Sequence, residues 1–213
     1  MWNSNFAYAV GLITTDGSLS IDGRHINLTS KDTEQLKTFA SILNLKNKIG
    51  EKKSSYNPNG RYYQIQFGDV KLYRFLLSIG LTPHKTKTLG VLTIPNKYFA
   101  DFLRGHLDGD GFTYSYWDKR WKSSFMLYTG FTCASLPHLD WIRGKIYELY
   151  GIDGQMKDNG RSTYYQLVYA KKASILLLAK MYHNQNVPCL LRKRFKIDRA
   201  LGIINRNAGM LER

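Results

Sequence analysis

The sequence contains few cysteines and no long hydrophobic run. Its two cysteines, Cys133 and Cys189, cannot build a disulfide framework and match no zinc-ligand spacing. We therefore expect an intracellular protein of a reducing compartment, such as the cytoplasm or an organelle matrix. No stretch of about 18 apolar residues occurs, so we expect no transmembrane helix. The first residues lack the basic and apolar regions of a secretory signal peptide, and we expect none.

Acidic residues are scarce as well. The chain has 16 Asp and Glu against 31 Lys and Arg, which gives a net charge of +15. A globular protein this basic usually binds a polyanion, most often nucleic acid and less often an anionic membrane surface. The apolar content of 43% and the aromatic content of 14% supply a sizeable core and argue against disorder. A length of 213 residues corresponds to one large domain or two small ones.

The chain repeats itself. Residues 9–17 and 103–111 share the pattern Gly-x-[Ile/Leu]-x-x-Asp-Gly, displaced by 94 positions. Two further echoes follow in the same order, pairing residues 28–30 with 131–133 and residues 59–67 with 159–169. Three echoes in register indicate a duplicated unit of about 100 residues. We therefore expect an N-terminal repeat over residues 1–97 and a C-terminal repeat over residues 98–213.

Each repeat is expected to be α+β, with the element order αββαββα. In the first repeat a helix ends at Asp16-Gly17, and polar and apolar residues alternate over 24–30, as in a half-buried strand. The remaining expected elements are strands over 18–22, 46–53 and 61–67, helices to about residue 43 and over 69–78, and a basic final helix over 190–205.

Both motifs place an aspartate, Asp16 or Asp110, at a helix C-terminus, where a negative charge is unfavourable. Small residues stand four apart in the two helices: Gly11 and Thr15, and Gly105 and Gly109. Such stripes allow two helices to pack closely, which would bring both aspartates to one end. Two adjacent carboxylates repel unless a cation lies between them or one of them is protonated, and oxygen ligands suit Mg²⁺. This arrangement predicts a phosphodiester hydrolase.

A simpler interpretation is available for a single motif. An Asp-Gly pair is an ordinary turn, and the chain has others at residues 22–23 and 153–154. One motif alone would therefore indicate a helix end. The duplication, the basic charge and the small-residue stripes together favour a site. Residues 108–119 do not fit a calcium-binding EF-hand loop, because Phe112 and Lys119 stand where oxygen ligands are needed.

Residues 9–17 and 103–111 resemble the two signature motifs of single-chain LAGLIDADG homing endonucleases. The matched positions are Gly11 and Gly105, Asp16 and Asp110, and Gly17 and Gly111, while the sixth position is Thr14 in one motif and Asp108 in the other. The resemblance implies two antiparallel, saddle-shaped sheets in the DNA major groove, joined at the motif helices. It further implies a monomer that cuts both strands of a long asymmetric DNA site. Mg²⁺ would be held by Asp16 and Asp110 with Gly109 and Thr15, Mn²⁺ would substitute, and Ca²⁺ would bind without supporting cleavage.

The family also places a basic residue beside each metal site, and this role carries over to Lys85 and Lys193. Lys87 and Arg192 are the neighbouring alternatives, and a plain phosphate contact is the alternative role. The family often has Gln or Asn at the end of the second strand, where this chain has Ser30 and Cys133.

The polar phase of the predicted strands and the adjoining loops gives the expected DNA contacts. In the first repeat these are Ser20, Asp22, Arg24, His25, Asn27, Thr29, Lys48, Lys52, Arg61, Tyr62, Gln64 and Gln66. In the second repeat they are Tyr114, Tyr116, Lys119, Arg120, Lys122, Arg161, Tyr164 and Gln166. The loop over residues 116–122 is expected to contact phosphate, or else to be a solvated turn whose two tryptophans fold back onto the core.

We predict a metal-dependent, sequence-specific DNA endonuclease, encoded within an intron or free-standing. One alternative is an intron maturase, for which the partner is the chain's own intron RNA. The other is a DNA-binding regulator that does not cleave. Retention of both Asp16 and Asp110 favours cleavage, because a protein that only binds has no need of two carboxylates beside a phosphate.

Overall fold

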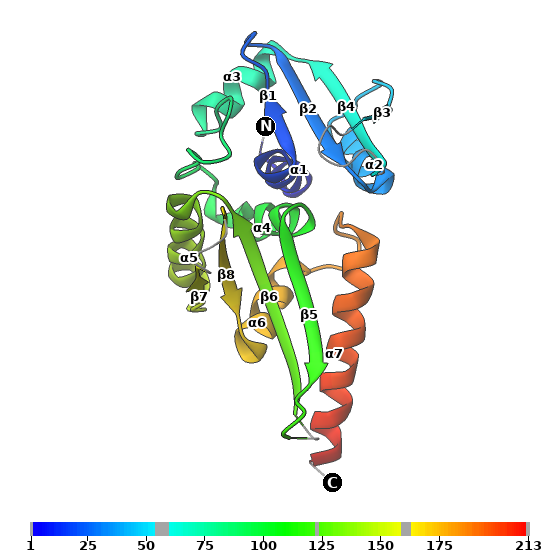
Figure 1. Ribbon diagram of the computed structural model, residues 1–213, viewed down its shortest axis with the longest axis vertical. Coiled ribbons are helices and arrows are strands. Elements are labelled where there is room, and N and C mark those ends of the chain that lie inside the picture. The colour runs from blue at the N-terminus through cyan, green and yellow to red at the C-terminus, as the bar shows by residue number, and fades with distance from the viewer. Residues whose placement is uncertain (1, 54–59, 122–123, 159–162, 212–213) are drawn as a thin grey trace.

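The computed structural model describes residues 2–53, 60–121, 124–158 and 163–211. The chain forms two halves, each with a four-stranded antiparallel sheet, and the helices α1 and α4 lie between them (Figure 1). Strand order is β1-β2-β4-β3 in the first sheet and β5-β6-β8-β7 in the second. The identical order confirms the predicted α+β duplication.

The first half contains α1 (Ser4–Thr15), β1 (Gly17–Leu19), β2 (His25–Ser30), α2 (Thr33–Ile42), β3 (Gly50–Lys52), β4 (Tyr62–Gly68) and α3 (Val70–Ser78). The Asn3 side chain begins α1 by accepting a hydrogen bond from the backbone N–H of Phe6 at 2.8 Å. Strand β2 buries every second residue, including Ile26 and Leu28, so one face of the sheet packs on the core and the other is open.

The second half begins with a short 3₁₀ turn, η1 (Asn96–Tyr98). Its other elements are α4 (Phe99–Asp108), β5 (Gly111–Trp117), β6 (Phe125–Cys133), α5 (Leu136–Tyr150), β7 (Gln155–Lys157), β8 (Tyr165–Tyr169), α6 (Lys171–Met181) and α7 (Leu191–Leu211). Gly151 ends α5 with φ +65°, a left-handed conformation that favours glycine. Helix α7 runs alongside β5 and beyond the end of the sheet (Figure 1).

Two strands of the first half are shorter than predicted. Strand β1 stops at Leu19 because the Asp22 carboxylate accepts hydrogen bonds from the backbone N–H groups of Arg24 and His25, at 3.1 and 3.0 Å, and closes a turn. Strand β3 starts only at Gly50, so Lys48 precedes it. The predicted strand positions of Ser20, Asp22 and Lys48 were therefore wrong.

The helices α1 and α4 pack at the closest approach between the halves. A Cβ atom on Gly11 would lie 2.2 Å from the carbonyl oxygen of Phe102, and one on Gly105 would lie 2.1 Å from that of Tyr8. No side chain larger than hydrogen fits at either position, since the neighbouring atoms belong to the backbone. This confirms the close packing predicted from the small residues. Within the described ranges, no helix is both long and apolar enough to cross a membrane.

Candidate active site between the two motif helices

The two motif aspartates lie where α1 and α4 end. Asp16 is the residue after α1, and Asp110 follows Gly109, the residue after α4. A Cβ atom on Gly109 would lie 1.9 Å from the hydroxyl oxygen of Thr15 and 3.1 Å from a carboxylate oxygen of Asp16. The end of one motif therefore touches the end of the other, and glycine at position 109 permits that contact.

The two carboxylates lie in one environment that surrounds them only in part: the Asp16 residue is half-buried and the Asp110 residue is exposed. Burial raises the pKa of Asp16 to about 7, and the negative charge of Asp110 acts in the same direction. Burial also raises the pKa of Asp110. The ammonium groups of Lys193 and Lys85 oppose both shifts. The site thus holds two carboxylates with raised pKa values next to two cations, an environment typical of functional carboxylates.

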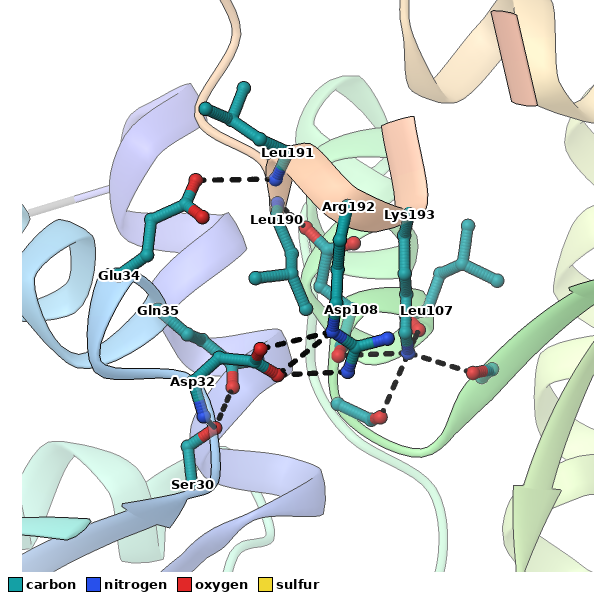
Figure 2. A network of polar contacts seen from close by, with 12 residues as sticks. Ser30, Asp32, Glu34, Gln35, Leu107, Asp108, Leu190, Leu191, Arg192 and Lys193 are labelled. Carbon is teal, nitrogen blue, oxygen red and sulfur yellow. Dashed lines mark hydrogen bonds and ion pairs between the residues drawn. The ribbon is translucent and has the colours of Figure 1, made fainter. Parts of the chain in front are cut away.

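The two lysines occupy equivalent positions relative to the motifs. The Lys85 ammonium donates a hydrogen bond to the carbonyl oxygen of Gly17, and that of Lys193 donates to the carbonyl oxygen of Gly111 at 2.8 Å. Each lysine thus binds the last glycine of a motif. Lys193 also lies 2.6, 2.9 and 3.0 Å from the carbonyl oxygens of Leu107, Asp108 and Gly109 (Figure 2).

Burial lowers the pKa of Lys85 and lowers that of Lys193 to about 8. The neighbouring basic residues lie elsewhere: the side chain of Lys87 is exposed, and Arg192 turns away to the N-terminus of α2. There the Arg192 guanidinium forms a bidentate ion pair with Asp32, with its closest contact at 2.8 Å (Figure 2). The geometry therefore distinguishes Lys85 and Lys193 from their neighbours, while their catalytic role stays a prediction.

Asp108, the sixth residue of the second motif, is hydrogen-bonded to other elements of the protein. One of its carboxylate oxygens accepts hydrogen bonds from the Tyr8 hydroxyl at 2.9 Å and from the backbone N–H of Leu190 at 2.7 Å. It therefore ties α4 both to α1 and to the start of α7. Thr14, its counterpart, donates only to the carbonyl oxygen of Val10 in its own helix. The divergence at this position reflects different packing around the two motif helices.

The strand-end positions where the family often has Gln or Asn are engaged locally. The Ser30 hydroxyl donates to the side-chain carbonyl oxygen of Gln35 at 2.6 Å, and the Cys133 sulfur accepts from the backbone N–H of Ser135 at 3.4 Å. A cavity of about 340 Å³ adjoins Ser30 and Gln35 and reaches Asp16. The sequence offered no signal for Gln35, which enters the site from α2.

The open face of the first sheet carries most of the predicted DNA contacts. Across β2 and β4, Asn27 lies opposite Gln66 and Thr29 lies opposite Gln64. Lys52 of β3 reaches the Thr29 hydroxyl at 3.3 Å. Tyr62 and His25 lie in the same strand phase, and the intervening residues are buried except Tyr63, which is half-buried. Arg24 and Arg61 lie in the segments just before β2 and β4. The predicted strand phase is therefore confirmed for this face.

The open face of the second sheet is aromatic. Tyr114 stacks on Tyr128 with ring centroids 4.9 Å apart, and Tyr116 and Phe112 continue the row on either side of Tyr114. Gln166 lies opposite Thr132 on this face, and Tyr164 precedes β8. Sequence reasoning missed Tyr128 and Phe112, although the alternation along β6 and β5 places both in the same phase as Tyr114.

The tip of the β5–β6 hairpin carries an ion pair, and its predicted contact with phosphate stays a prediction. The Arg120 guanidinium is paired with Asp118 at 3.1 Å, so one of the two basic groups is already neutralised. Lys119 lies beside it in the turn. The alternative of two tryptophans folded onto the core was wrong, because Trp117 is 46% and Trp121 67% exposed. Lys122 and Arg161 lie outside the described residues.

The donor set suits a hard divalent cation. The described residues contain no cluster of three or more His, Cys, Asp or Glu side chains, so protein side chains alone do not complete a metal site there. Two carboxylates beside backbone carbonyl groups nevertheless match the oxygen ligands of Mg²⁺, which keeps several waters. Thr15 and Gly109 are engaged in other bonds: the Thr15 hydroxyl donates to the carbonyl oxygen of Leu12 at 3.1 Å, and the Gly109 carbonyl accepts from Lys193.

Comparison with solved structures identifies the fold. No protein-family model and no curated protein sequence matches the chain. The homing endonuclease I-LtrWI, bound to target DNA, superimposes with a TM-score of 0.61 at 12% identity, over 99% of this chain and 91% of that one. This chain has the LAGLIDADG fold. The homing endonuclease I-DmoI matches with a TM-score of 0.56 at 18% identity, over 85% of this chain and 96% of that one.

The LAGLIDADG fold is also that of the N-terminal domain of DUF199/WhiA. That structure matches with a TM-score of 0.56 at 17% identity, over 93% of this chain and 88% of the other. Other structures of I-DmoI are complexes with DNA determined in the presence of Mg or with Mn or Ca. At these identities the likeness establishes the LAGLIDADG architecture, with its two motif helices at the centre.

Proposed function

We propose that this protein is a Mg²⁺-dependent endonuclease that binds a long, asymmetric duplex DNA site as a monomer and cuts both strands. The observation that carries the proposal is the pair of neighbouring aspartates at the meeting ends of α1 and α4, flanked by two lysines. The homing endonucleases I-DmoI and I-LtrWI, solved with DNA on the same fold, support it.

Different residues would bind the metal ion, stabilise charge on the phosphate and bind the duplex. Asp16 and Asp110 would hold Mg²⁺, with Thr15 and Gly109 as further ligands, and the ion supplies a Lewis acid that activates water and stabilises a leaving oxygen. Lys85 and Lys193, fixed by carbonyl groups of the motifs, would place positive charge where the phosphate becomes more negative. The open faces of the two sheets would hold the duplex in register, since hydrogen bonds to base edges specify sequence.

Removal of either motif carboxylate tests this proposal. Asp16→Asn or Asp110→Asn should abolish cleavage of both strands in Mg²⁺ while DNA binding stays measurable. Asp140→Asn, at an exposed carboxylate on α5, is the matched control and should leave cleavage intact. Unchanged cleavage in either motif variant would contradict the assignment. The DNA substrate for these assays would be found by selection from a randomised duplex library, for cleaved sites in Mg²⁺ and then for bound sites in Ca²⁺.

The outcome of that selection also separates the alternatives. Duplex binding without cleavage in Mg²⁺ or Mn²⁺ would favour a DNA-binding protein that does not cut. Binding of the chain's own intron RNA in preference to duplex DNA would favour a maturase. Cleavage in Mg²⁺ and Mn²⁺ with binding alone in Ca²⁺ is the result that we expect.

A further inference from the structure

A basic groove lies between α7 and the edge strand of the second sheet. The cavity has a volume of about 470 Å³. It is lined on the strand side by Tyr114, Tyr116 and Trp117 and on the helix side by Lys196, Arg199 and Ile203. Strand β5 is the outer strand of its sheet, and α7 lies along it (Figure 1). Consecutive residues 113–117 line the cavity together with buried Phe125, so the groove runs along the β5 edge of the sheet beside α7.

The helix presents two different faces. Ile197 and Ala200 are buried against the core, whereas Lys196 and Arg199 are exposed. Positions 196, 199 and 203 recur at helical spacing, so their side chains line the groove as one stripe. The cationic pair is held at this edge because the apolar side of α7 is fixed by packing.

Lys196 and Arg199 differ from other basic residues of α7 in having no ion-pair partner among the residues that the structure describes. Other basic residues of α7 are engaged: Arg192 pairs with Asp32, and Arg194 pairs with Asp198 at 2.9 Å. Lys196 and Arg199 form no ion pair with any other described residue. Two such cations beside the edge strand β5 form a surface suited to the sugar–phosphate backbone of a nucleic acid.

We propose that this groove binds the phosphodiester backbone of duplex DNA, extending the contact surface of the second sheet around its β5 edge. This inference rests on the proposed function, because it takes duplex DNA as the partner. The first half differs: its edge strand β1 spans three residues against the seven of β5, and within the described residues the first half ends in the nine-residue helix α3, whereas the second half ends in the 21-residue helix α7. The contact is therefore specific to one side of the target.

Salt dependence of binding tests the groove directly. We would titrate the full chain against a mixed-sequence duplex of about 40 base pairs by fluorescence anisotropy, in EDTA, from 50 to 200 mM NaCl. Each phosphate contact contributes about 0.9 to the slope of log K against log salt, so Lys196→Gln with Arg199→Gln should lower the slope by about 2. Over this salt range the wild type should then lose about tenfold more affinity than the variant.

A matched pair controls for charge alone. Lys71 and Arg74 are also exposed, also three residues apart and also on a helix, α3 of the first half. Lys71→Gln with Arg74→Gln should lower the slope by less than 0.5. Exchanging the two groups, Lys196→Arg with Arg199→Lys, keeps both charges and should keep the slope. This second variant shows whether an effect arises from charge or from damage to α7.

Several results would overturn the proposal. These are an unchanged slope in the Lys196–Arg199 variant, an equal loss in the Lys71–Arg74 variant, or an effect seen with single-stranded RNA but not with duplex DNA. Because binding is measured without Mg²⁺, failure of the groove is distinguishable from failure of the proposed cleavage, which depends on Asp16 and Asp110. Trimming each flank of the selected target in turn adds a positional test: the difference between wild type and variant should disappear when one flank is removed and persist when the other is.

Discussion

At the centre of the molecule the two halves repeat the same contacts, although their sequences have diverged. Lys85 binds the carbonyl group of Gly17, and Lys193 binds that of Gly111. Gly11 and Gly105 face each other across the helix pair. All of these contacts are made to backbone atoms, and such contacts tolerate little change in geometry. The central symmetry is therefore retained where the two chain segments touch most closely.

The same crossed contact occurs at the N-termini of α2 and α5. In one half, Asp32 before α2 holds Arg192 from the far end of the chain. In the other, the Ser135 hydroxyl donates to the carbonyl oxygen of Leu89, and the His138 ring contacts that of Gly90 at 2.8 Å. Each helix start thus holds the lysine-bearing segment of the opposite half. The position of the contact is retained, while its chemistry changes from ionic to buried and neutral.

The periphery of the two halves differs. The first sheet exposes amide, hydroxyl and lysine groups, and the second exposes stacked aromatic rings beside a basic helix. A symmetric centre applies the same chemistry twice, whereas unlike faces suit unlike half-sites. This contrast supports the proposal of an asymmetric target, and each of the following variants compares a position in one half with its counterpart in the other.

The largest effect is expected at the helix contact. Gly11→Ala and Gly105→Ala each place a Cβ atom within 2.2 Å of a backbone oxygen, so the helices must separate. Each should lower the free energy of unfolding by about 4 kcal/mol or more, measured by urea denaturation. Gly144→Ala on α5, where a Cβ atom meets no neighbour, should instead raise it by up to about 1 kcal/mol. A mild effect at either motif glycine would contradict the central symmetry.

The second comparison concerns His138 and Gln35, which occupy equivalent places on α5 and α2. Burial lowers the pKa of His138 to about 4, and its ring lies 3.3 Å from the ring of His106, whose pKa burial also lowers. The unfolded chain takes up a proton near pH 6.5 and the folded chain does not, so stability falls as the pH drops from 6.5 towards 4. For His138 the loss should reach about 3 kcal/mol.

A variant isolates this contribution, because buried carboxylates act in the opposite direction. Burial raises the pKa values of Asp16 and Asp108 to about 7 and about 6. These two groups therefore make the folded protein more stable as the pH falls, because the folded state takes up their protons first. His138→Gln gives α5 the residue that α2 has at the equivalent position, Gln35. It also removes one group that takes up a proton when the chain unfolds. The difference in unfolding free energy between wild type and variant should therefore change between pH 6.5 and pH 4. A constant difference would show that His138 is not buried in its neutral form.

The third comparison concerns the sixth motif position. Asp108→Thr gives the second motif the residue of the first and leaves the buried donors of Tyr8 and Leu190 without an acceptor. It should lower the free energy of unfolding by about 2 kcal/mol. Thr14→Val removes only a hydrogen bond to the preceding turn and should change it by less than about 0.5 kcal/mol. Similar values for the two variants would mean that Asp108 does not tie α4 to α7.

The sequence predicted the fold well because its strongest signals are local and occur twice. Alternation over residues 24–30 and 61–67 gave β2 and β4 their phase, and the Gly-x₄-Asp pattern placed both aspartates together. The lengths of β1 and β3 were wrong because an Asx turn at Asp22 and the register of β4 decide them. Neither is visible as a pattern of hydrophobicity.

The candidate site was predictable only in part. Asp16, Asp110, Lys85 and Lys193 follow from the motifs and the resemblance, since each lies at a fixed place relative to a motif. The Tyr8–Asp108 and Asp32–Arg192 contacts join residues 100 and 160 positions apart, so no local sequence pattern predicts them. The groove along α7 depends on which face of that helix packs, which only the tertiary structure determines.

The smallest effect is expected at the Asp32–Arg192 pair. The two side chains are 24% and 53% exposed, so water screens their attraction, although the bidentate geometry favours it. A double-mutant cycle with Asp32→Asn and Arg192→Gln should give a coupling free energy of about 0.2–1 kcal/mol that shrinks in 1 M NaCl. Its buried counterpart, tested by Ser135→Ala, should cost about 1 kcal/mol at any salt concentration, because the bond to Leu89 is neutral. A salt-independent ion pair would mean that the two crossed contacts are alike in strength as well as in position, and that the divergence between the halves is confined to the open faces of the sheets.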